Sequence, residues 1–102
     1  MSVKALVILG EGFEEAEAIV PVDIMRRAGF EVVTLAAGSS LVVTGSHGIK
    51  VVADALLADA GSHNGDVLVL PGGPGTKRLA QNSEVCSLVE HYVSANKFVA
   101  AI

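Results

Sequence analysis

The stretch Asp66–Thr76, DVLVLPGGPGT, constrains the fold of this chain more than any other part of its sequence. Residues Val67–Leu70 form a short, continuous apolar run, which is typical of a parallel strand covered on both faces. Pro71 ends the run because it has no N–H for a sheet ladder, and the glycines after it let another group approach the backbone closely. Ligands of open α/β sheets bind just outside the carboxyl ends of the strands. The stretch therefore predicts a buried parallel strand with a binding site at its end.

The composition agrees with such a sheet. The 102 residues are 51% hydrophobic and 18% charged, with a mean hydropathy of +0.56. No apolar run reaches the roughly 18 to 20 residues that span a bilayer, so we expect the apolar side chains in a core. The net charge of −4 offers no basic surface for nucleic acid, and no segment has the pattern of a signal peptide. We therefore expect a cytoplasmic α/β protein without a membrane or nucleic-acid partner.

The hydrophobic pattern places further strands and helices around this strand. Gly29 is well placed as the left-handed cap of a first helix. Pro21, inside that helix, has no N–H to bond the carbonyl of Glu17, so a kink or loosened turn is expected there. The strand–helix–strand order predicts right-handed parallel crossovers. We expect strands at 5–9, 30–36 and 98–102, the last of them buried, a hairpin of 41–44 and 49–53, and helices at 14–28, 54–60, 76–81 and 83–95.

Cysteine and histidine show no metal-site pattern. Cys86 is single, which excludes an internal disulfide framework, and His47, His63 and His91 are scattered without metal-ligand spacing. Cys86 lies in the body of an expected helix, so we interpret it as a small apolar residue and not as a nucleophile. His63 and His91 are interpreted as structural or surface residues. Neither a metal nor a cofactor is expected.

The glycines do not form a nucleotide-binding motif. Gly72, Gly73 and Gly75 lack the spacing of a phosphate-binding loop, and the glycines at 10 and 12 are followed by glutamates that would repel a pyrophosphate. The N–H groups of Gly72 and Gly73 are instead candidate donors to an oxyanion, a site that also needs a nucleophile and usually a base.

Glu14, Glu15 and Glu17 open the first helix. Carboxylates in a first turn interact favourably with the helix dipole, each by about 0.3 to 1 kcal/mol when exposed. We expect this effect to account for two of the three. Glu17 is singled out because Pro21 also leaves its backbone carbonyl without a helical donor.

Four stretches together resemble the ThiJ/PfpI family, in its DJ-one-like branch: LVILGEGFEEAEAIVPVDIMRRAG, VTGSHGIKVVAD, DVLVLPGGPGT and FVAAI. They cover essentially the whole chain in order. The resemblance implies a flavodoxin-like three-layer α/β sandwich with a mostly parallel sheet, related to the glutamine-amidotransferase-like domains, and a homodimer. In that family a nucleophilic cysteine follows directly after a strand that ends like FVAAI, and a histidine partner lies further along. We therefore expect residues 1–102 to be the amino-terminal portion of a single domain, incomplete in this chain, with the cysteine just after Ile102.

The resemblance also implies roles for three residues of this chain. Glu17 matches the family glutamate, usually protonated, that hydrogen-bonds the cysteine. Gly73, with Gly72 beside it, matches the backbone donors near that sulfur. This agrees with the expectation, drawn from the residues alone, of N–H groups and a carboxyl group at one edge of the sheet.

This sequence departs from the family pattern in two places. The turn Pro74–Thr76 is tighter than in many relatives, and the hairpin around Ser46 and His47 has no cysteine, so a redox role of accessory cysteines does not carry over. Arg26 and Arg27 lie in the helix that relatives use at their dimer interface, and a solvated helix face explains this pair equally well.

The resemblance implies a cysteine-dependent protein that acts on reactive carbonyls such as methylglyoxal, in a glyoxalase- or deglycase-like reaction of stress protection. The alternative is a non-enzymatic redox sensor or chaperone with an oxidisable elbow cysteine. A weaker alternative is an intracellular peptidase or a thiamine-pathway protein, although no residue specifies a peptide or thiazole pocket. The expected partners are a small carbonyl substrate, a second copy of the chain and the remainder of its own domain.

Overall fold

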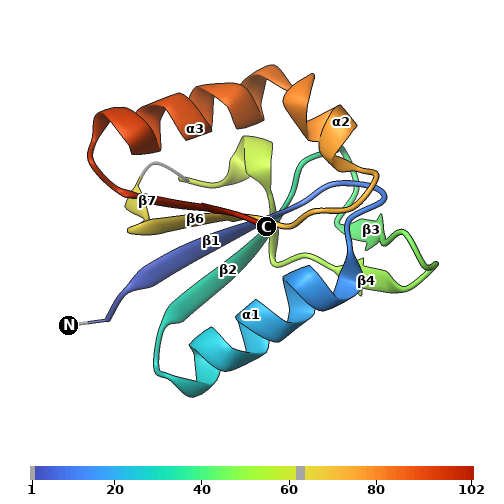
Figure 1. Ribbon diagram of the computed structural model, residues 1–102, viewed down its shortest axis with the longest axis horizontal. Helices are drawn as coiled ribbons and strands as arrows, with labels where there is room; N and C mark the ends of the chain where they lie inside the picture. The colour runs from blue at the N-terminus through green and yellow to red at the C-terminus, as the bar shows by residue number, and fades with distance from the viewer. Residues whose placement is uncertain (1, 62–63) are drawn as a thin grey trace.

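The computed structural model describes residues 2–61 and 64–102, so His63 lies outside the described residues. In this part of the chain, five parallel strands form a central sheet in the order β5-β2-β1-β6-β7, and helices cover both faces (Figure 1). The strands β3 and β4 form a separate antiparallel hairpin. The bounds are β1 Lys4–Leu9, α1 Glu15–Arg27, β2 Glu31–Ala36, β3 Val42–Thr44, β4 Lys50–Val52, β5 Ala55–Leu56, a 3₁₀ turn Leu57–Asp59, β6 Val67–Leu70, α2 Thr76–Ala80, α3 Ser83–Ser94 and β7 Phe98–Ala101.

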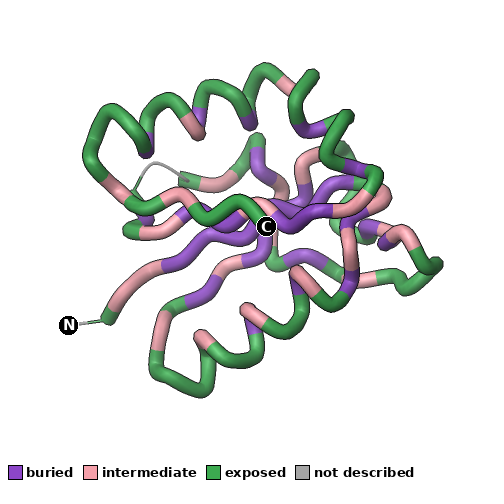
Figure 2. The backbone as a smooth tube through the Cα atoms, viewed as in Figure 1, coloured by how far each residue is buried: buried purple, intermediate pink, exposed green. Residues whose placement is uncertain are grey.

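Strand β1 divides the core into two layers. Its side chains alternate between the faces of the sheet, so Ala5, Val7 and Leu9 belong to the cluster that contains Ala18 and Val22 of α1. Leu6 and Ile8 belong to the opposite cluster, with Leu88 and Tyr92 of α3. The central strands are accordingly the most deeply buried part of the molecule (Figure 2). This is the three-layer α/β arrangement that the sequence predicts.

Most of the predicted elements are confirmed, including the hairpin and the end of the first helix at Gly29. Gly29 has a φ of +91°, as expected for the residue after a helix. The Asn82 side chain caps α3 by accepting from the amides of Glu84 and Val85. Pro21 lies inside α1 without ending it. None of the described helices has the length and apolar character needed to cross a bilayer.

Two predictions about the edges of the sheet are wrong. Residues 54–60 form the short strand β5 and a 3₁₀ turn instead of one short helix, because Asp54 bonds Thr34 through both its amide and its carboxylate and so aligns the segment with β2. Strand β7 pairs with β6 in parallel, as expected, but it lies at the edge of the sheet and is not buried. Phe98 is 75% exposed.

Candidate functional site

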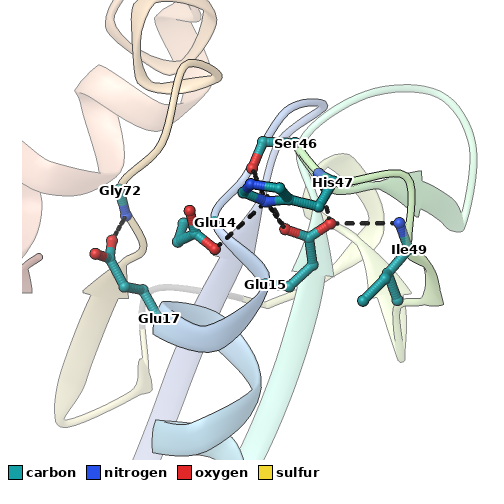
Figure 3. A network of polar contacts seen from close by, with 7 residues as sticks. All are labelled: Glu14, Glu15, Glu17, Ser46, His47, Ile49 and Gly72. Carbon is teal, nitrogen blue, oxygen red and sulfur yellow. Dashed lines mark hydrogen bonds and ion pairs between the residues drawn. The ribbon is translucent and has the colours of Figure 1, made fainter.

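The segment Pro71–Gly75, which we call the glycine corner, is bonded to the first turn of α1 at the carboxyl end of β6. The Gly72 N–H donates to Glu17 Oε1 at 2.9 Å (Figure 3). The Gly72 carbonyl accepts from the amide of Glu14 at 2.9 Å. Two of the residues that the sequence singles out, 55 positions apart, therefore meet through a direct hydrogen bond.

The space around Gly72 explains why this position carries no side chain. A Cβ built on Gly72 would collide with Glu17 Oε1 and would lie 2.5 Å from the carbonyl oxygen of Ile102. The Ile102 amide in turn donates to the Leu70 carbonyl at 3.0 Å. The ends of β6 and β7 and the first turn of α1 thus converge on one point of the sheet edge, where parallel α/β folds bind ligands.

Gly73, the third predicted residue, has a φ of +99°, a conformation that side chains other than glycine rarely adopt. Among the described residues, its N–H has no hydrogen-bond acceptor. The corner therefore offers one amide that is engaged, that of Gly72, and one that is available, that of Gly73.

Glu15 has a structural role at this edge that its position in the first helical turn does not predict. Its side chain is 9% exposed, so it is not merely a surface carboxylate in the helix dipole. Oε2 accepts from the amides of His47 and Ile49 at 2.8 and 3.3 Å, while Oε1 accepts from the Ser46 hydroxyl at 3.3 Å and faces His47 Nδ1 at 3.1 Å (Figure 3). A Cβ on Gly45 would collide with this carboxylate. Glu15 therefore fixes residues 45–49, the hairpin turn between β3 and β4, against α1.

Glu15 and His47 are electrostatically coupled. Partial desolvation alone would raise the pKa of Glu15, but hydrogen bonds from its own amide, the His47 amide and ring and the Ile49 amide outweigh it and lower the pKa to about 2. The hydrogen bond to Glu15, followed by the negative charges of Glu14 and Glu15, raises the pKa of His47 above 6.5. A carboxylate only accepts hydrogen bonds, so His47 Nδ1 carries the shared proton.

Glu14, Glu15 and His47 bring three donors of metal-binding type within 4.8 Å of one another, and no other such group occurs within residues 2–61 and 64–102. Spacing along the sequence does not reveal this group, because His47 comes from the hairpin turn. Its Nδ1 already donates to Glu15, so a metal ion would have to displace that proton. We describe the group as a hydrogen-bonded ion pair and assign no metal to it.

The chain is similar to known proteins over nearly its whole length. Residues 3–102 match the DJ-1/PfpI family. The chain belongs to this family. The protein dj-1beta of Drosophila melanogaster is 38% identical over 103 residues, which cover 100% of this chain and 55% of the fly protein.

Two solved structures of DJ-1 proteins superpose closely. A cysteine-to-alanine variant of a DJ-1 superfamily protein from Salmonella typhimurium is 42% identical, with a TM-score of 0.92, over 97% of this chain and 54% of that one. Oxidized Toxoplasma gondii DJ-1 is 33% identical, with a TM-score of 0.94, over 98% of this chain and 55% of that one. The chain spans about half the length of these relatives. The flavodoxin-like DJ-1/PfpI fold predicted from the sequence is confirmed.

The remaining residues named from the sequence lie away from the DJ-1/PfpI glycine corner or are bonded within the chain. Cys86 is exposed on α3, not buried as its apolar interpretation requires, and its thiol donates to the Ala80 carbonyl at 3.3 Å. His91 is also exposed on α3. Arg26 bonds Asp54, and Arg27 pairs with Asp23 on its own helix.

Two open hollows of about 430 Å³ flank the glycine corner. One, largely apolar, lies between the ends of β6 and β7 and the helices α2 and α3, with Cys86 at its wall. The other lies between the corner and the hairpin turn, and is lined by Glu11, Gly12, Thr44, Gly45, Ser46, Pro74, Gly75 and Arg78. Both are of a size that admits a small organic molecule.

Proposed function

We propose that this DJ-1/PfpI chain is part of a cysteine-dependent protein that acts on small reactive carbonyls such as methylglyoxal, in a glyoxalase- or deglycase-like reaction. The observation that supports this most directly is the 2.9 Å hydrogen bond between Glu17 and the Gly72 amide at the carboxyl end of the sheet. It sets a carboxyl group beside backbone donors, which are the groups that an addition to a carbonyl requires in addition to a nucleophile.

Each residue has a definite part in the proposed reaction. A thiolate supplied after β7, as the family resemblance implies, adds to the aldehyde carbon, and the carbonyl electron pair moves to oxygen. The Gly73 amide, which has no acceptor within the described residues, binds that oxygen. Gly72 holds Glu17 in place, and Glu17 transfers the proton that yields the hemithioacetal. The solved Salmonella relative bears a substitution of a cysteine, which supports a central role for that residue type.

The test is the consumption of methylglyoxal by the purified protein, extended beyond Ile102 as its relatives are. We expect the change Glu17→Gln to lower kcat/KM by about 100-fold or more, because general acid–base catalysis typically contributes 10² to 10⁴. Glu31→Gln is the matched control, since Glu31 is an exposed glutamate at the opposite end of the sheet. Absence of methylglyoxal consumption, or equal rates in the Glu17 and Glu31 variants, would refute the proposal.

A redox sensor or chaperone is the second candidate, and the oxidized state of the Toxoplasma relative favours it. In this function the same thiolate is oxidised by peroxide to sulfinate, and Glu17 and the Gly73 amide bind the sulfinate oxygens. Mild peroxide followed by mass mapping is the test. Selective oxidation of a cysteine just after β7 supports the sensor, and oxidation confined to exposed Cys86 contradicts it.

We also propose that the protein is cytoplasmic, that residues 1–102 form the amino-terminal portion of one domain, and that the assembly is a homodimer formed through α1. Apolar side chains exposed on α1 and β4 support the dimer: Ile19, Val20 and Ile24 are 42%, 51% and 58% exposed, and Val52 is 68% exposed. Sedimentation of wild type and of Ile24→Asp tests it. A wild-type monomer at micromolar concentration would refute the dimer.

A further inference from the structure

The first turn of α1 lies between two loops, and its carboxylates point to opposite sides. Side chains two positions apart on a helix do not face each other, so Glu15 and Glu17 diverge. Glu17 points to the glycine corner, and Glu15 points to the hairpin turn (Figure 3). The helix turn that carries Glu17 is therefore bonded to the hairpin turn on one side and to the glycine corner on the other.

Glu15 makes this connection rigid. Its four hydrogen bonds join three residues of the hairpin turn, Ser46, His47 and Ile49, and two of the bonds come from backbone amides. The hairpin turn is attached to the loop before α1 by one more close backbone bond, from the Ser46 amide to the Phe13 carbonyl at 2.8 Å. The buried carboxylate of Glu15 is thus the main side-chain link between the two segments.

His47 supplies the part of this link that responds to charge. Its ring is 70% exposed, and its Nδ1 lies 3.1 Å from Glu15 Oε1 and 3.7 Å from Glu14 Oε1. The other charged groups around the turn are Glu11, whose carboxylate accepts from the Thr44 amide, Arg78 across the hollow and Lys50 on β4. The Ser46 hydroxyl oxygen lies 3.0 Å from Nδ1, and the charged groups nearest to the ring are both negative, which favours the imidazolium.

We propose that Glu15 and His47 act as a positioning pair, which holds the first turn of α1 so that Glu17 stays against the Gly72 amide. The pair touches no reacting group. Its importance for catalysis rests on the proposed function, whereas its effect on the geometry of Gly72 does not.

Protonation of His47 changes the strength of this pair. With an imidazolium donor the bond to Glu15 joins two opposite charges, whereas with a neutral ring only the carboxylate is charged and the bond is weaker. The pKa of His47 is raised above its ordinary value, so the charged form persists toward neutral pH and is lost as pH rises through that raised value. The contact between Glu17 and Gly72 is therefore expected to loosen as His47 loses its proton.

The test is a pH titration of the protein followed by ¹H–¹⁵N NMR, from about pH 5.5 to about pH 9, the range in which histidine titrates. The Gly72 amide resonance reports on its hydrogen bond to Glu17, and the His47 ring resonance gives the midpoint. We expect one step in the Gly72 shift at the His47 midpoint, its loss in His47→Gln, and its retention in the control His91→Gln. His47→Arg, which stays charged throughout, should hold Gly72 at the low-pH position.

Glu15→Gln tests whether His47 affects the Gly72 amide by positioning the first turn of α1 or directly through the electric field of its own charge. This variant leaves His47 titratable, with a lower pKa because the Glu15 charge is gone, but replaces the carboxylate that links the turn to α1. The Gly72 step should disappear in Glu15→Gln; if Gly72 still follows the His47 ring, the positioning role is wrong. No Gly72 step in wild type, or a step that persists in His47→Gln, would also overturn the proposal. These readouts need no turnover, so inactivity toward methylglyoxal would count against the proposed function alone.

Discussion

The tightest steric constraint at the candidate site is Gly72, and Gly72→Ala tests it. A Cβ at this position would collide with Glu17 Oε1 and lie 2.5 Å from the Ile102 carbonyl oxygen. Overpacking of this kind costs about 1 to 3 kcal/mol, and displacement of Glu17 removes a hydrogen bond worth about 0.5 to 1.5 kcal/mol. Alanine gains back about 0.4 to 1 kcal/mol by restricting the unfolded chain. We expect the free energy of unfolding to fall by about 0.5 to 4 kcal/mol.

Gly38→Ala is the matched control. Its Cβ would meet no atom within 4 Å, and the backbone at Gly38 does not adopt a positive φ. This change should leave stability unaltered or raise it by up to about 1 kcal/mol. Urea unfolding followed by circular dichroism measures both variants, with an unchanged m-value as the check that the transition is the same. If Gly72→Ala is as stable as Gly38→Ala, the close contact with Glu17 is not as described.

Three further changes probe the elements around the site. Asn82→Ala removes the acceptor for two amides at the start of α3 and should lower the free energy of unfolding by about 1 kcal/mol in urea, whereas Asn82→Asp, which keeps the acceptor and loses only the donor to the Ala37 carbonyl at 3.4 Å, should lose less. Tyr92→Phe leaves the buried Gly65 amide without the hydroxyl that accepts from it at 3.0 Å and should cost about 1 to 3 kcal/mol; an unchanged unfolding midpoint would contradict this. Because the pKa of Glu15 is lowered, this carboxylate adds stability that is fully present above about pH 4.5 and is lost as the pH falls toward about 2. Because the pKa of His47 is raised, the imidazolium adds stability that is fully present below pH 6.5 and is lost as the pH rises through the raised pKa. The difference in unfolding free energy between wild type and Glu15→Gln should therefore be largest between about pH 4.5 and 6.5, and a difference that is flat from pH 3 to about 9 would refute the coupling.

The parts of the fold that the sequence predicts are those with local signals. The apolar run Val67–Leu70 has no alternation, and in the structure it lies between β1 and β7 with a sheet neighbour on each side. Gly29 marks a helix end because cap geometry depends on a few adjacent residues. The residues alone predicted N–H groups and a carboxyl group at one edge of the sheet, and the family resemblance was needed to pair Glu17 with the glycine corner.

The missed features depend on contacts between distant parts of the chain. Glu15 looks like one of several dipole-facing carboxylates, and its partners on the hairpin turn lie 31 to 34 residues away. Strand β5 has two residues, too few for any periodicity, and it forms because Asp54 bonds Thr34 across the sheet. The apolar composition of β7 predicts burial, but exposure depends on the strand's neighbours and not on its own residues.

A consistent physical pattern connects the glycines and glutamates around α1. The side chain of Glu14, the residue before the helix, makes no cap hydrogen bond, and its amide donates to the Gly72 carbonyl. The carboxylates of Glu15 and Glu17 likewise accept from amides of the two neighbouring loops. Gly45 and Gly72 lie where those carboxylates leave no room for a Cβ. The helix start is therefore stabilised by exchanging hydrogen bonds with the loops, and this exchange requires glycine in both loops and a carboxylate on each side of the helix turn.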